Sequence, residues 1–204
     1  MKPLIVANLK MNPPTLEEAR VLFNQVKETG AVICPPFIYL SALKANGAQD
    51  CFWEEKGAFT GEISPQMLKS LGVEYVIIGH SERRKYQEET DEIIEKKIKA
   101  SLVAGLKPIL CIDKISQIPT GIENLVLAYE PLFAIGTGKA CPPEKAEEMR
   151  ISIKNKINAP VLYGGSVNSQ NAKDYLQKAR FDGLLVGGAS LKPAEFIDII
   201  KNVC

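Results

Sequence analysis

The sequence predicts an α/β protein with a single (β/α)8 barrel domain spanning residues 1–204, and two observations carry this prediction. Short runs of β-branched and apolar residues alternate with amphipathic stretches, a pattern typical of parallel strands connected by helices. Eight such units can be counted, which favours closure of the sheet into a barrel. The alternative is an open, doubly wound sheet, but no Gly-x-Gly-x-x-Gly motif follows the first strand, where a dinucleotide site would need it.

The predicted strands are short and mostly apolar. They cover residues 4–8, 31–34, a weak segment ending near Asp50, 75–79, 108–112, 125–130, 159–163 and 183–186. The stretches between them carry apolar residues at helical spacing, which predicts helices at residues 15–29, 39–45, 65–71, 90–104, 143–157, 169–178 and 193–202. Thr15, Ser64 and Pro143 are residue types that favour the start of a helix.

One connection is unusually short. Residues 113–123 must lead from the end of the fifth strand back to the start of the sixth, and such a parallel connection needs a dozen or so residues and usually a helix. Pro119 and Gly121 interrupt the stretch, so we expect at most one or two turns near residues 114–118. The helix between strands 5 and 6 is therefore predicted to be shortened or missing.

Composition argues against several classes of protein. The formal net charge is +1 and Lys and Arg form no long runs, which argues against a nucleic-acid-binding or membrane-binding surface. Five widely spaced cysteines without a Cys-x-x-Cys pair favour a reduced, cytoplasmic protein. Residues 1–10 carry only a short apolar run, too brief for a signal peptide or a membrane span. We therefore expect no nucleic-acid or membrane partner.

In a (β/α)8 barrel the loops that follow the strands converge on one face and carry the chemistry. One such loop begins at Glu130, which Pro131 biases towards extended backbone, so its carboxylate should lie at the end of strand 6. A short apolar segment and two glycines follow. This order is typical of a catalytic base under a lid that is hinged at Pro131 and at residues 136–138. The alternative is an ordinary strand-to-helix loop with an incidental acid.

Other strand ends also carry polar residues or glycines. Lys10 could place a positive charge opposite an anionic substrate, or could be a solvated loop lysine. His80 is the only histidine, and a predicted helix start after it disfavours a protonated ring, although a single core histidine is the common alternative. Gly-Gly pairs at residues 164–165 and 187–188 follow strands 7 and 8, where this fold usually binds phosphate.

Six motifs occur in order along the chain: Asn8-Leu-Lys-Met-Asn, Gly57-Ala-Phe-Thr-Gly-Glu-Ile-Ser, Ile78-Gly-His-Ser-Glu-Arg-Arg, Ala128-Tyr-Glu-Pro-Leu-Phe-Ala-Ile-Gly-Thr-Gly-Lys, Tyr163-Gly-Gly-Ser-Val and Val186-Gly-Gly-Ala-Ser. Together they resemble the triosephosphate isomerase family, whose fold is the TIM barrel. The chain is shorter than the roughly 250 residues usual for that fold. The resemblance implies interconversion of dihydroxyacetone phosphate and D-glyceraldehyde 3-phosphate through an enediol, in glycolysis and gluconeogenesis.

The resemblance also implies a role for each matched position. Glu130 would be the base, neutral His80 would move protons among the substrate oxygens, and Lys10 and Asn8 would hold those oxygens. Glu82 would support Lys10 and His80, and Cys111 would pack behind Glu130. Backbone N–H groups of Gly136, Ser166, Gly187 and Gly188 would bind the phosphate, with Ile135 and Leu185 packing on Glu130. The lid would comprise Pro131, Leu132, Phe133, Ala134, Ile135, Gly136, Thr137, Gly138 and Lys139.

By the same resemblance the protein would be a homodimer in which the Thr60 loop inserts near Asn8 and Glu82 of the second subunit. No metal or organic cofactor is expected, because a carboxylate, an imidazole and a cation suffice for an enediol route. Leu9 and Leu132-Phe133 depart from the family's usual aromatic residue and Val-Trp pair. Two other functions stay open: a phosphate-binding barrel with impaired turnover, and another sugar-phosphate enzyme. The combination of Lys10, His80 and Glu130 favours the isomerase.

Overall fold

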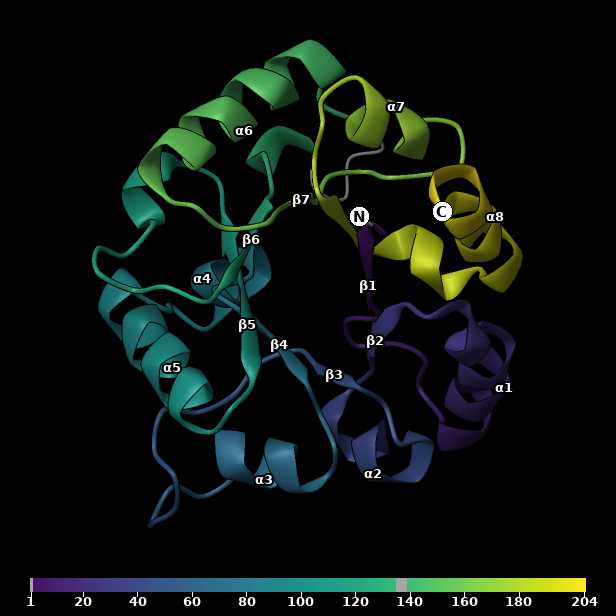
Figure 1. Ribbon diagram of the computed structural model, residues 1–204. Coiled ribbons are helices and arrows are strands. Elements are labelled where there is room, and N and C mark those ends of the chain that lie inside the picture. The colour runs from purple at the N-terminus through teal and green to yellow at the C-terminus, as the bar shows by residue number, and fades with distance from the viewer. Residues whose placement is uncertain (1, 135–138) are drawn as a thin grey trace.

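Eight parallel strands form the centre of the computed structural model, which describes residues 2–134 and 139–204 (Figure 1). The strands are β1 (Leu4–Asn8), β2 (Val32–Cys34), β3 (Gly47–Ala48), β4 (Tyr75–Ile78), β5 (Lys107–Ile112), β6 (Val126–Tyr129), β7 (Val161–Tyr163) and β8 (Gly183–Val186). Helices surround them: α1 (Leu16–Val26), α2 (Leu40–Leu43), α3 (Pro65–Ser70), α4 (Ser81–Tyr86), α5 (Asp91–Val103), α6 (Pro143–Lys156), α7 (Ala172–Gln177) and α8 (Pro193–Val203). The predicted (β/α)8 barrel is confirmed.

Local sequence signals account for where several helices begin. The Thr15 hydroxyl accepts a hydrogen bond from the Glu18 N–H at 3.3 Å, and the Ser64 hydroxyl accepts one from the Met67 N–H at 3.2 Å. Each bond satisfies an N–H group that the first helical turn leaves without a partner. Helix α7 begins later than predicted, because the Asn168 side chain accepts the N–H groups of Gln170 and Asn171 and holds that segment in a turn.

The core has an inner and an outer layer. Alternate residues of the strands point into the barrel and fill it with apolar side chains: Val6, Val32, Cys34, Ile77, Ile109, Cys111, Val126, Ala128, Leu162 and Leu185. The other strand residues pack outwards against the helices in a larger cluster. The barrel interior is therefore a packed core rather than a channel, and a ligand has space only above the strand ends.

The ring of hydrogen-bonded strands is interrupted between β2 and β3. Strand pairing runs β2-β1-β8-β7-β6-β5-β4-β3, so β2 and β3 stand at the two ends of the hydrogen-bonded order. Strand β3 has only two residues, and a Cβ on Gly47 would lie 2.5 Å from the Cys34 Sγ, so the two strands touch. Two side chains replace ladder bonds: Asn46 Oδ1 accepts from the Ile33 N–H at 3.0 Å, and Gln49 Nε2 donates to the Cys34 carbonyl at 2.8 Å.

The connection between β5 and β6 contains one 3-10 turn, η3 (Ile115–Gln117), and no α-helix, as the sequence predicts. The Gln117 side-chain oxygen accepts the Asp113 N–H at 2.9 Å and holds the turn closed. Ile118 and Ile122 are buried in the outer core and replace the apolar face that a helix would supply. The wall between α5 and α6 is therefore thin but covered (Figure 1). Among the described helices, none is long and apolar enough to cross a membrane.

Candidate active site

The predicted site residues meet at the carboxyl ends of the strands. A cavity of about 320 Å³ opens there, bordered by residues that follow β1, β4, β6, β7 and β8. Its walls include Asn8, Lys10, His80, Glu130, Gly164, Gly165, Ser166, Val167, Asn168, Leu185, Gly187, Gly188 and Ala189. Glu82 is not part of this wall but contacts two of its members. Val167 and Ala189 belong to the two Gly-Gly motifs but have no predicted role, and Asn168 directly follows the first motif.

Lys10 has an unusual backbone conformation, and three neighbouring side chains hold the residue in place. Its φ angle is +53°, in the left-handed region that residues with a Cβ rarely adopt. Its N–H donates to Asn8 Oδ1 at 3.0 Å, and its carbonyl accepts from Gln49 Nε2 at 2.8 Å. The ammonium lies 2.5 Å from Glu82 Oε1. Surrounding structure must compensate such backbone strain, so the position of this lysine is set by its neighbours rather than by a regular strand.

His80 caps the first turn of α4 with its own side chain. The Nδ1 atom accepts a hydrogen bond from the Glu82 N–H at 3.2 Å, and the Nε2 atom lies 3.3 Å from Glu130 Oε1. Because Nδ1 acts as an acceptor, the neutral ring in this arrangement carries its proton on Nε2. The imidazole therefore presents an N–H group to the cavity and to Glu130.

The charge of His80 depends on opposing influences. Burial lowers the pKa of the imidazole, the adjacent Glu130 carboxylate raises it, and the net direction is upward from the ordinary value. The Glu82 N–H acts against protonation, because a proton on Nδ1 would face that donor. The sequence indicated the helix start but not the contact with Glu130. The neutral ring therefore stays a prediction.

Glu130 is almost completely buried beside the cavity. Its Oε2 atom has no conventional hydrogen-bond partner among the residues that the structure describes. The Cys111 thiol lies behind the carboxylate, and burial together with Glu130 raises the pKa of that thiol well above its ordinary value. A Cβ on Gly164 would come within 3.0 Å of Glu130 Cγ, so glycine makes room for the acid. A poorly solvated carboxylate next to a cavity is suited to accept a proton.

The segment predicted as a lid begins directly after this carboxylate. Residues Leu132–Ala134 form a 3-10 turn, η4, in which Leu132 and Phe133 are exposed and Ala134 is buried. The Ala134 carbonyl accepts a hydrogen bond from the Ser166 hydroxyl at 2.5 Å. Ile135, Gly136, Thr137 and Gly138 lie outside the described residues. The described start of the segment thus contacts the turn that follows β7.

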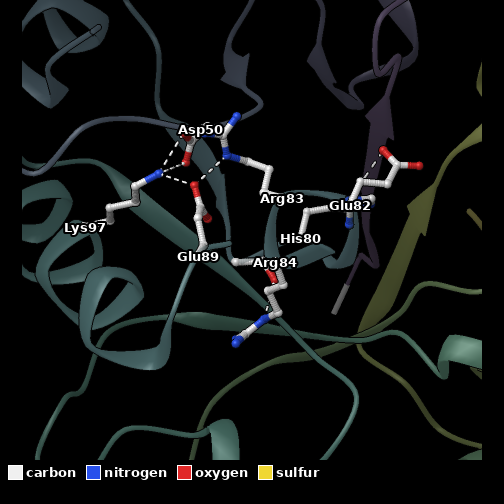
Figure 2. A network of polar contacts seen from close by, with 8 residues as sticks. Asp50, His80, Glu82, Arg83, Arg84, Glu89 and Lys97 are labelled. Atoms are coloured by element: carbon white, nitrogen blue, oxygen red, sulfur yellow. Dashed lines mark hydrogen bonds and ion pairs between the residues drawn. The ribbon is translucent and has the colours of Figure 1, made fainter. Parts of the chain in front are cut away.

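A second group of charged side chains, which the sequence did not indicate, lies beside α4. We call Asp50, Arg83, Glu89 and Lys97 the buried ion cluster (Figure 2). Lys97 Nζ lies 2.8 Å from both carboxylate oxygens of Asp50 and 2.5 Å from Glu89 Oε1. Arg83 contacts the same two acids at 2.9 and 2.6 Å. Because Arg83 directly follows Glu82, the cluster anchors the helix that carries Glu82 and begins after His80.

Comparison with known proteins identifies the family of this chain. A family model described as triosephosphate isomerase matches residues 3–203. The chain belongs to the triosephosphate isomerase family. A triosephosphate isomerase of Alkaliphilus oremlandii is 42% identical over 246 aligned positions, which cover 98% of this chain and 99% of that one. One from Carboxydothermus hydrogenoformans is 40% identical over 247 positions, covering 98% of each chain.

Solved triosephosphate isomerases share the fold as well. The crystal structure of triosephosphate isomerase from Bartonella henselae superimposes with a TM-score of 0.84 at 33% identity and covers 99% of both chains. The sequence alignment with the Alkaliphilus protein spans 246 positions, whereas this chain has 204 residues. This member of the triosephosphate isomerase family is therefore a shortened form, and the short β5–β6 connection is one place where it is compact.

Proposed function

We propose that this protein interconverts dihydroxyacetone phosphate and D-glyceraldehyde 3-phosphate by proton transfer through an enediol or enediolate. The reaction is an intramolecular aldose–ketose isomerisation, used in glycolysis and gluconeogenesis. One observation carries the proposal: Lys10, His80 and Glu130 border a single cavity, with Glu130 Oε1 at 3.3 Å from His80 Nε2. Membership of the triosephosphate isomerase family supports it over the other sugar-phosphate enzymes.

The residues have separate tasks in this proposal. Glu130 removes a proton from C1 of dihydroxyacetone phosphate, and the C2 oxygen becomes negative as the enediolate forms. The Nε2–H of His80 donates a proton to that oxygen, and the Lys10 ammonium stabilises the developing charge. His80 then regains a proton from the C1 hydroxyl, and Glu130 returns its proton to C2. Atoms and charges balance without a metal or an organic cofactor.

The glycine-rich turns after β7 and β8 are the proposed phosphate site. Ser166, Gly187 and Gly188 border the cavity, and their backbone N–H groups are the proposed donors to the phosphate. Gly136 is assigned the same role from the family resemblance. Leu185 also borders the cavity and is placed to exclude water from Glu130.

Dimer formation through the Thr60 loop belongs to the same proposal. The loop between β3 and α3 projects away from the barrel, and Phe59 is exposed on it (Figure 1). A separate hollow of about 360 Å³ lies beside Lys10, His80 and Glu82. Met11, 91% exposed, and Tyr86 also border this hollow. An apolar-edged hollow of this kind could receive the Thr60 loop of a second copy and cover these side chains.

Sedimentation at micromolar concentration tests the dimer. We expect twice the chain mass of 22.4 kDa, and a fully active species of 22.4 kDa would remove the proposed role of Thr60. A cytoplasmic location is proposed as well, supported by the five free cysteines.

A coupled assay for glyceraldehyde 3-phosphate formed from dihydroxyacetone phosphate tests the activity. The same reaction in D₂O, followed by proton NMR, should show deuterium entering the carbon-bound position of the product, because a protein base exchanges its proton with solvent. Binding of the substrate without turnover would instead favour the phosphate-binding barrel. Turnover without deuterium incorporation would argue against the enediol route.

A further inference from the structure

Two tyrosine hydroxyls hold Cys141, which lies just after the segment predicted as the lid. The Cys141 N–H donates to Tyr163 Oη at 3.1 Å, and Tyr175 Oη donates to the Cys141 carbonyl at 2.6 Å. All three residues are buried. Both polar groups of one buried residue's backbone are thus satisfied by side chains, from the end of β7 and from α7.

The two tyrosines also contact each other closely. Their rings stack with centroids 3.6 Å apart and planes at 12°. Burial raises the pKa of both phenols. The two stacked rings therefore place their hydroxyls on the two backbone polar groups of the same residue, Cys141. Each group in such a network fixes its neighbours, so removing one hydroxyl leaves buried partners unsatisfied.

This network lies directly beside the proposed phosphate turn. Tyr163 immediately precedes Gly164, and a Cβ on Gly165 would lie only 2.9 Å from the Tyr163 hydroxyl and 3.3 Å from the Ala134 Cβ. The next residue, Ser166, has a φ angle of +47° and donates its hydroxyl proton to the Ala134 carbonyl. The backbone of this turn is therefore packed against the tyrosine network on one side and against the start of the lid segment on the other.

We propose that Tyr175 is a positioning residue for the phosphate side of the active site. Its hydroxyl holds the Cys141 carbonyl, and its ring stacks on Tyr163. The Tyr163 hydroxyl in turn holds the Cys141 N–H and packs beside Gly165 in the Gly164–Ser166 turn. Tyr175 itself does not border the cavity, so it acts on the phosphate only through this chain of contacts. The inference rests on the proposed function, because it takes the Gly164–Ser166 turn to be the phosphate site.

The variant Tyr175→Phe tests the role, because it removes the hydroxyl and keeps the stacked ring. We expect KM for the triose phosphate and the inhibition constant of inorganic phosphate each to rise by about three-fold to ten-fold, the range for one lost hydrogen bond. The value of kcat should change less, by about two-fold or under, since Lys10, His80 and Glu130 are untouched. Tyr39→Phe is the matched control, because Tyr39 is also buried but lies beside β2; both constants should stay unchanged.

A double-mutant cycle with Tyr163→Phe separates positioning from general stability. If both hydroxyls act through Cys141, the effects of the two variants on the phosphate inhibition constant should be clearly less than additive. An unchanged inhibition constant in Tyr175→Phe, with only a lower melting temperature, would overturn the role of Tyr175. If Tyr175→Phe does not fold, an unchanged inhibition constant in Tyr163→Phe would overturn it instead.

Failure of the underlying assignment gives a different result. Suppose that the coupled assay detects turnover but inorganic phosphate does not compete with the substrate in the wild-type protein. The Gly164–Ser166 turn is then not the phosphate site, and the positioning role of Tyr175 is overturned as well. If the wild-type protein shows no turnover at all, the proposed function fails, whereas phosphate binding and its dependence on Tyr175 can still be measured by calorimetry with inorganic phosphate.

Discussion

Helix α4 contributes neighbouring residues to two groups of charged side chains that differ in burial and in contact with the cavity above the strand ends. Glu82 belongs to the candidate active-site group with Lys10, His80 and Glu130. The next residue, Arg83, points to Asp50 and Glu89 in the buried ion cluster (Figure 2). In the cluster every charged side chain has an oppositely charged partner within 2.9 Å. In the candidate active-site group Glu130 lies 3.3 Å from His80, and the paired side chains of Lys10 and Glu82 are 28% and 43% exposed.

Residue type therefore does not distinguish the two groups, whereas burial of the charges and contact with the cavity do. Both groups contain acids and cations on the same helix and its neighbours. In the cluster, opposite charges neutralise each other and hold α4, α5 and the loop after β3 together. In the candidate active-site group the Glu130 carboxylate and the His80 ring lie 3.3 Å apart and both residues border the cavity, where a substrate can approach them.

Replacing one acid from each group gives the largest contrast. Glu130→Gln should keep the fold and phosphate inhibition while lowering kcat by about 10² to 10⁴, the range typical of a general base. Glu89→Gln is the matched change in the cluster and should lower the melting temperature while retaining most of kcat. Both variants are measured by the coupled assay and by thermal unfolding. Near-normal turnover in Glu130→Gln would remove this residue from the mechanism.

Removing a cation from the cluster should mainly affect stability. Lys97→Met leaves Asp50 and Glu89 with Arg83 as their only cation in the cluster, and breaking a buried pair in this way costs about 3 to 5 kcal/mol in the free energy of unfolding. Urea denaturation measures the change. Lys99→Met is the control on the same helix, because Lys99 is 61% exposed and its pair with Glu95 should contribute little. Equal effects of the two substitutions would contradict the importance of burial.

The buried ion cluster should also make the stability of the protein depend on pH. Burial raises the pKa of Asp50 from 3.8 to about 6, although Lys97 and Arg83 oppose the shift. The folded state therefore binds a proton more tightly than the unfolded state, so this contribution to stability is present below pH 4 and is lost as the pH rises through 6. Unfolding free energies at pH 4 and pH 7 should show a decrease on the order of 1 to 3 kcal/mol that is missing in Asp50→Asn. An identical pH profile for Asp50→Asn would contradict the raised pKa.

The smallest expected effect concerns the single histidine. Because the Glu130 carboxylate raises the pKa of His80, Glu130→Gln should lower that pKa. Nitrogen NMR follows this titration directly, and it also identifies the tautomer, which should carry its proton on Nε2. An unchanged titration in the variant would exclude the coupling. A doubly protonated ring in the wild-type protein at pH 7 would contradict the predicted neutral imidazole.

Much of the fold could be predicted because its signals are local. Thr15 and Ser64 mark helix starts through bonds to N–H groups three residues away. Pro119 and Gly121 forbid a long helix between β5 and β6, and the structure has only η3 there. The site residues could also be anticipated, because strand ends in a (β/α)8 barrel share one face. Short-range patterns thus predict which helices and strands form and which end of the barrel carries the candidate site.

Contacts between residues far apart in the chain could not be predicted from the sequence and are seen only in the folded structure. Asp50 and Lys97 are 47 residues apart, and Cys141 and Tyr175 are 34 apart. No periodicity or spacing links these pairs, since they meet only when the barrel brings its loops and helices together. The same holds for the closure at β2 and β3, where side chains of Asn46 and Gln49 replace ladder bonds. It also holds for the pKa of His80, because burial and a neighbouring carboxylate shift a pKa only once the chain has folded.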